Sequence, residues 1–92
     1  VLVNVSRGGV VDQAALLAAL DGPGGLARAG LDVSSPEPLP PGHALRGHAS
    51  VVWTPHRGSA TKGARRAMAE LAAENLARGV AGAPLAHCCN GL

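Results

Sequence analysis

The stretch VLVNVSRGGVVDQAALLAAL, residues 1–20, decides the fold of this chain. Its first five residues are nearly all β-branched or aliphatic, which is typical of a strand covered on both faces of a sheet. After a polar turn, Asp12 is placed to cap a helix that continues through Leu20. The glycines and proline of DGPGG, residues 21–25, then end that helix.

Two further apolar segments predict the remaining strands. ARAGLDV, residues 27–33, is the weaker of the two because it contains a glycine, and SVVWT, residues 50–54, is short and clear. A long helix capped by Ser59 or Thr61 is expected to run to about Val80. A strand, a crossover helix and a second strand of this size indicate a parallel β-α-β unit. We therefore predict an α/β fold with a parallel sheet and flanking helices.

The composition argues against several classes of function. A formal net charge of +2 with scattered basic residues and one aromatic residue does not indicate nucleic-acid binding. No apolar run approaches the ~20 residues of a membrane span. Cys88 and Cys89 are adjacent, so they predict neither a disulfide framework nor a metal site. We expect a cytoplasmic protein with no metal, no membrane partner and no nucleic-acid partner.

Polar side chains follow each of the three predicted strands. Arg7 comes after the first, Asp32 and Glu37 after the second, and His56 and Ser59 after the third. Ligands of open parallel sheets bind outside the carboxyl ends of the strands, so these groups should meet at one edge. Each alone is more simply explained as a turn or surface residue. Together they form a chemically complementary set, which favours a functional site.

The loop that follows the second strand holds its carboxylate stiffly. Glu37 lies between Pro36 and Pro38, which fix their own φ angles and bias Glu37 towards an extended backbone. A stiff carboxylate is suited to orient a partner, and His56 is the natural candidate. We predict that Glu37 contacts the His56 ring, which then acts as a general acid near neutral pH. A stiffened linker with an incidental acid is the alternative.

Three motifs, in this order and spacing, resemble a known family. VNVSRGGVVDQAALLAAL, AGLDVSSPEPLP and TPHRGSAT are similar to the C-terminal signatures of the D-isomer-specific 2-hydroxyacid dehydrogenases. The second and third motifs look most like the glyoxylate/hydroxypyruvate reductases of that family. The resemblance implies that residues 1–80 are the C-terminal portion of a Rossmann-type NAD(P)-binding domain with its catalytic loops. Residues 81–92 are then a C-terminal tail, and the chain is expected to be a fragment.

The resemblance also implies roles for the residues at the strand ends. Arg7, Glu37 and His56 would be catalytic: Arg7 would grip the substrate, Glu37 would support His56, and His56 would donate the proton. Arg7, His56 and Ser59 would contact the substrate. Arg57 departs from the family pattern, which usually has an apolar residue between the histidine and the glycine. Gly9 also departs from it, because the family often has a residue with a side chain at this position.

The same resemblance implies a cofactor, NADPH or NADH, lined by Val5, Asp32 and Gly58. The implied reaction is the reduction of a small 2-keto acid, glyoxylate or hydroxypyruvate, to the D-2-hydroxy acid by a full-length homodimeric enzyme. The 92-residue piece alone is expected to be inactive. A 3-phosphoglycerate dehydrogenase-like enzyme, a non-enzymatic corepressor and a truncated product of the same fold are the alternatives.

Overall fold

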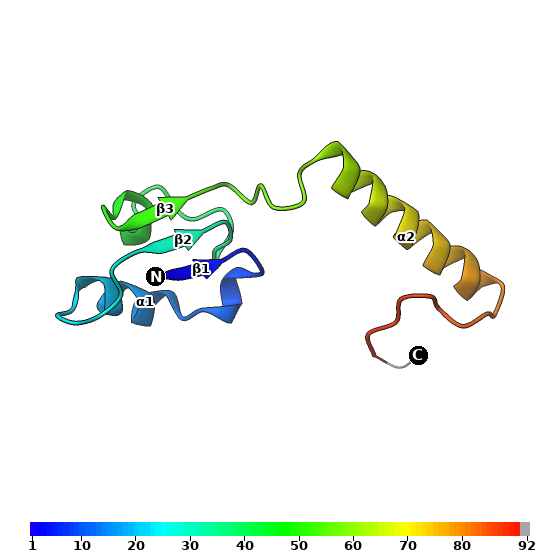
Figure 1. Cartoon of the computed structure of the whole chain (residues 1–92), viewed down its shortest axis with the longest axis horizontal. Helices are drawn as coiled ribbons and strands as arrows, with labels where there is room; N and C mark the ends of the chain where they lie inside the picture. The colour runs from blue at the N-terminus through cyan, green and yellow to red at the C-terminus, as the bar shows by residue number, and fades with distance from the viewer. Residues whose placement is uncertain (91–92) are drawn as a thin grey trace. The chain divides into compact units, whose positions relative to one another are not determined.

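The computed structural model of the chain describes residues 1–90. It divides into two compact units, Val1–Gly58 and Ser59–Leu92. The first unit contains a small sheet with one α-helix, and the second contains one long α-helix and the segment after it (Figure 1).

The first unit is built on a parallel sheet whose three strands lie in the order β1-β2-β3. β1 spans Leu2–Asn4, β2 spans Ala29–Leu31 and β3 spans Val51–Trp53. Each strand lies within the segment that the sequence predicts, and the parallel pairing is confirmed. Parallel strands place their carboxyl ends at one edge, which is the arrangement that the expected site requires.

The helix α1, Gln13–Asp21, connects β1 to β2 and lies along one face of the sheet (Figure 1). Its cap is the one predicted: the Asp12 carboxylate accepts the backbone N–H groups of Ala14 at 2.9 Å and Ala15 at 3.0 Å. These bonds satisfy two of the donors that the first helical turn leaves without a partner. A short 3-10 turn, η1 (Gly8–Val10), precedes the cap.

The core lies between the sheet and α1 and includes the loop after β2. Leu45, in the 3-10 turn η2 (Ala44–Gly47), is fully buried. The buried apolar residues of the cluster are Leu16, Ala29, Leu31, Leu39 and Leu45. Because Leu45 and Leu39 belong to the loop between β2 and β3, that loop is anchored in the core and is not a free linker.

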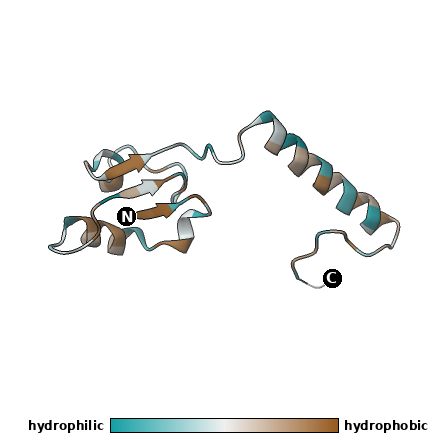
Figure 2. Cartoon of the chain, in the orientation of Figure 1, coloured by the Kyte–Doolittle hydropathy of each residue, from teal (hydrophilic) through white to brown (hydrophobic). Residues whose placement is uncertain are grey.

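The opposite face of the sheet is uncovered within this unit. Val3, Gly30 and Val52 are in register across the three strands, and Val3 and Val52 are 68% and 67% exposed. Figure 2 shows β1 and β3 as hydrophobic strands. Within the first unit, α1 covers only one face of the sheet, so the prediction that the first strand is covered on both faces is not met there.

The second unit is formed by α2, Lys62–Val80, and the segment that follows it. Of the two predicted caps, the structure uses Thr61, whose hydroxyl accepts the N–H of Ala64 at 3.1 Å. The Asn75 side-chain oxygen accepts the N–H groups of Ala86 at 3.1 Å and His87 at 3.3 Å, which folds the following segment back onto the helix. Within the described part of the chain, α2 has no buried residue, and no helix has the length and apolar character to cross a membrane.

Candidate active site

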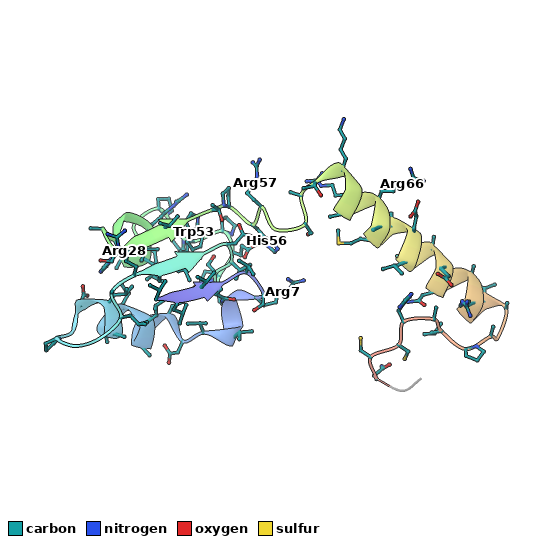
Figure 3. The ribbon with its side chains drawn as sticks, in the orientation of Figure 1. Arg7, Arg28, Trp53, His56, Arg57 and Arg66 are labelled. Carbon is teal, nitrogen blue, oxygen red and sulfur yellow. The ribbon has the colours of Figure 1, made fainter. Side chains whose placement is uncertain are left out.

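The candidate site lies where the polypeptide leaves the carboxyl ends of the three strands. Figure 3 shows Arg7 on the loop after β1 and His56 on the loop after β3, whereas Arg28 lies at the opposite end of the sheet. Asp32 directly follows β2, and Glu37 lies further along the same loop. The sheet therefore brings the predicted groups of the first unit to one edge, as expected from its parallel topology.

His56 is held by an unusual backbone turn. Its φ angle is 51°, in the left-handed region that non-glycine residues seldom occupy. Its N–H donates to the carbonyl oxygens of Asp32 at 2.9 Å and Thr54 at 3.0 Å. A left-handed residue of this kind costs on the order of 1–3 kcal/mol, and such residues cluster at functional sites. The turn fixes the direction in which the imidazole leaves the loop.

The Asp32 carboxylate stabilises that turn by accepting hydrogen bonds from residues on both sides of His56. It is 6% exposed, and its Oδ1 accepts the hydroxyl proton of Thr54 and the N–H of Arg57 at 2.7 Å. Its Oδ2 accepts the N–H of Gly58 at 2.7 Å. The Thr54 hydroxyl and these two amides hold the pKa of Asp32 below its ordinary value, against the opposing effect of burial. The carboxylate therefore braces the loop that presents His56.

Glu37 is held in position by a hydrogen bond from within its own loop. The N–H of Ser34 donates to Oε2 of Glu37 at 3.2 Å, and the Ser34 hydroxyl donates to the carbonyl oxygen of Pro36 at 2.8 Å. Oε1 of Glu37 contacts Nδ1 of His56, so the predicted contact between these residues is confirmed. The hydrogen bond with His56 lowers the pKa of Glu37 most, and the hydrogen bond from Ser34 lowers it further. An ionised Glu37 is thus favoured, and it can accept a hydrogen bond from Nδ1–H of His56.

The contact at Nδ1 leaves the other ring nitrogen for a ligand. Among residues 1–90, no hydrogen bond involves Nε2 of His56. The side chains of His56 and Glu37 are 41% and 38% exposed, so solvent and small molecules reach the pair. An imidazole with Nδ1 bonded to a carboxylate and Nε2 accessible has the arrangement of a general acid or base.

A cavity of about 340 Å³ opens beside the pair. Both carboxylates and His56 line it, together with the remaining lining residues Pro38, Leu39, Arg46, Trp53 and Pro55. Arg46 and Trp53 were not predicted as site residues. A sequence signal for Trp53 exists in retrospect, since it is the single aromatic residue and ends β3. The sequence gives no such signal for Arg46, because its place beside the cavity depends on the position of η2.

Arg7, Val5 and Gly58, the other site residues predicted in the first unit, do not line this cavity. Arg7 is exposed and is not among the lining residues; its Nη1 donates to the carbonyl oxygen of Ser6 at 2.6 Å. Its charge nevertheless contributes to the lowered pKa of Glu37. Val5 is 67% exposed just after β1. Ser59 begins the second unit, so its place beside the substrate stays a prediction.

The two departures from the expected pattern are accommodated. Arg57 is exposed, and in Figure 3 its side chain and that of His56 leave the loop on opposite sides. A side chain at Gly9 would have open space around it, with nothing within 4 Å of its Cβ. Neither residue displaces a group of the site.

Comparison with known proteins decides the family. Residues 1–58 match the model described as "D-isomer specific 2-hydroxyacid dehydrogenase, NAD binding domain". The chain belongs to this family. The matched residues are those of the first unit, which carries the Glu37–His56 pair.

Individual relatives agree with this assignment. The human glyoxylate reductase/hydroxypyruvate reductase is 51% identical over 85 residues, which cover 92% of this chain and 26% of that protein. A D-isomer specific 2-hydroxyacid dehydrogenase from Xanthobacter autotrophicus Py2, solved with NADPH and MES, superposes with a TM-score of 0.74 at 45% identity, covering 91% of this chain and 34% of that one. A phosphoglycerate dehydrogenase from Lactobacillus plantarum is less similar, with a TM-score of 0.63 at 37% identity, and covers 94% of this chain and 28% of that one. The chain spans about a quarter of the length of the curated relatives it matches. The fold is that of a Rossmann-type nucleotide-binding domain, as predicted.

Proposed function

We propose that this chain is the catalytic C-terminal part of the nucleotide-binding domain of an oxidoreductase that reduces a small 2-keto acid to a D-2-hydroxy acid. The observation that carries the proposal is the contact between Glu37 and Nδ1 of His56, with Nε2 left for a ligand. Glyoxylate and hydroxypyruvate are the proposed substrates, because the human relative named for them is 51% identical. Residues 1–80 are assigned to the domain and residues 81–92 to a tail that extends beyond the described residues.

His56 serves as the proton donor in this proposal. The Glu37 carboxylate accepts a hydrogen bond from Nδ1–H and stabilises the imidazolium, in which Nε2 also carries a proton. When the keto carbon gains a hydride, the carbonyl π electrons move to the oxygen. That oxygen takes the proton from Nε2, and the imidazole becomes neutral. A general acid placed in this way contributes about 10²–10⁴-fold to the rate.

The residues of the strand edge fit the nicotinamide end of NADPH or NADH, which supplies the hydride when bound. Val5 offers an exposed apolar side chain at the end of β1. Oδ2 of Asp32 accepts one hydrogen bond and has a lone pair left for a carboxamide N–H. A Cβ on Gly58 would lie 3.0 Å from that oxygen, so the glycine keeps this side of Asp32 open. We assign cofactor contacts to these three residues.

Arg7 and Ser59 complete the proposed substrate contacts. The Arg7 guanidinium is exposed and, within residues 1–90, makes one hydrogen bond, to the carbonyl oxygen of its neighbour Ser6. It therefore retains donors for a bidentate contact with the carboxylate of a 2-keto acid. The proposed complete enzyme is cytoplasmic and acts as a homodimer. Phosphoglycerate as the substrate is less supported, because the named phosphoglycerate dehydrogenase is only 37% identical.

The proposal is tested in a chimeric reductase, made by replacing the aligned segment of the human relative with this chain. We expect the chimeric reductase to reduce glyoxylate and hydroxypyruvate with NADPH or NADH, and the 92 residues alone to show no turnover. His56→Gln should lower kcat by about 10²-fold or more. His48→Gln is the matched control, because His48 bonds Asp21 at 3.1 Å outside the cavity. Equal activity of the two variants would contradict the assignment of His56.

A further inference from the structure

The loop that carries Glu37 has few hydrogen-bond donors of its own. Pro36 and Pro38 have no backbone N–H, so a segment rich in proline cannot be fixed by a regular ladder. The hydrogen bonds from Ser34 act within the loop and do not attach it to the rest of the unit. Buried Leu39 anchors the loop on the C-terminal side of Glu37, and an attachment on the N-terminal side must come from outside the loop.

Gln13 supplies that attachment from the first residue of α1. Its side-chain Nε2 donates to the carbonyl oxygen of Ser35 at 2.7 Å, and its Oε1 accepts the N–H of Ser35 at 2.9 Å. One amide therefore satisfies both backbone groups of a single residue, 22 positions away in sequence. Two bonds from one planar group fix orientation as well as distance.

The 3-10 turn η1, which precedes α1, lies in close contact with the peptide between Ser34 and Ser35. A Cβ built on Gly8 would lie 1.9 Å from the carbonyl carbon of Ser34 and 2.5 Å from the backbone nitrogen of Ser35. The backbones of η1 and of the Glu37 loop thus meet in direct contact at the peptide that Gln13 holds. Two independent contacts, one from η1 and one from the first residue of α1, meet at the same point of the loop.

We propose that Gln13 is a positioning residue that fastens the Glu37 loop to α1 through Ser35, and thereby holds Glu37 against Nδ1 of His56. Gln13 touches neither reacting group in this role; it acts through Ser35 and the two following residues. The geometric part stands on the hydrogen bonds alone, and only its consequence for catalysis rests on the proposed function.

The test compares Gln13→Met with Asp12→Ala in the 92-residue chain. Methionine keeps the length and helix propensity of glutamine but offers no amide. Asp12→Ala removes the cap of the same helix without removing either bond to Ser35. It is therefore the control for general loosening of α1.

Two NMR readouts separate positioning from general stability, and neither needs substrate or cofactor. Exchange of the Ser35 amide proton should become about five- to tenfold faster in Gln13→Met than in Asp12→Ala, since one specific bond is lost. The measured pKa of Glu37 should rise towards its ordinary value of 4.5 in Gln13→Met and stay lowered in Asp12→Ala.

Three results would overturn the proposal. They are an unprotected Ser35 amide in the unsubstituted chain, equal Ser35 exchange in the two variants, and a Glu37 pKa that moves equally in both. An inactive chimeric reductase with the expected NMR changes would count against the proposed function and leave the attachment intact.

Discussion

Adding one methyl group at Gly8 should disrupt the contact between η1 and the Glu37 loop. The Cβ of Gly8→Ala would lie 1.9 Å from the Ser34 carbonyl carbon and 2.0 Å from its oxygen, about 1.5 Å short of ordinary contact. Both partners are backbone atoms, so no side-chain rotation relieves the overlap. Overpacking typically costs about 1–3 kcal/mol, and this case lies at the upper end because neither side yields. We expect the free energy of unfolding to fall by about 3 kcal/mol.

Gly9→Ala is the matched control, one residue along the same turn. Its Cβ would meet nothing within 4 Å, and the smaller conformational freedom of alanine in the unfolded chain should stabilise by about 0.4–1 kcal/mol. Chemical denaturation of the 92-residue chain, followed by circular dichroism, gives both values. In the chimeric reductase, a shift of roughly 1 Å in the Glu37 loop should lower kcat about 10²-fold for Gly8→Ala. Equal stability of the two variants would refute the close contact between η1 and the Glu37 loop.

Further predictions concern the core, acid stability and substrate binding. Leu45→Ala should lower the free energy of unfolding by about 2–5 kcal/mol, whereas Val52→Thr, on the exposed face, should change it by about 0.5 kcal/mol or less; similar losses would contradict the assigned core. The lowered pKa of Asp32 stabilises the fold in full above the ordinary value of 3.8, and this stability is lost as the pH falls through the lowered value. Asp32→Asn should therefore be less stable than the unsubstituted chain near neutral pH, with a gap that narrows on acidification, and a pH-independent gap in urea titrations would argue against it. Arg7→Ala should raise KM in the chimeric reductase at least about tenfold through loss of a charge-assisted pair, while Arg28→Ala, at the opposite end of the sheet, should not; equal KM values would remove Arg7 from the substrate site.

The sequence was sufficient to predict the three strands, the two α-helices and the central pair. Alternation of apolar runs with helix caps identified three strands and two helices, and Asp12 and Thr61 form the caps as expected. Glu37 and His56 were predicted to meet because parallel strands deliver their following loops to one edge. That inference needs only the order of strands and helices and the residue types that follow each strand, and both can be predicted from the local sequence.

Other features depend on coordinates that no local pattern encodes. The left-handed backbone of His56 is accompanied by a hydrogen bond from its N–H to the distant carbonyl of Asp32, and histidine itself does not demand this conformation. Arg46 reaches the cavity because Leu45 beside it anchors η2 in the core. Gln13 reads in the sequence as an ordinary residue of a first helical turn, and its bonds to Ser35 appear only once the loop is folded. Such pairings between distant segments are set by packing.

The central claim is that Glu37 supports His56 as the proton donor, and the pH dependence of kcat tests it most directly. In the chimeric reductase, Glu37→Gln keeps the size of the side chain but removes the charge that stabilises the imidazolium. Asp21→Asn, which alters the remote partner of His48, is the control. We predict that the upper limb of the kcat profile moves to lower pH in Glu37→Gln and stays in place in Asp21→Asn. A Glu37→Gln profile that coincides with that of the unsubstituted chimeric reductase would contradict the claim.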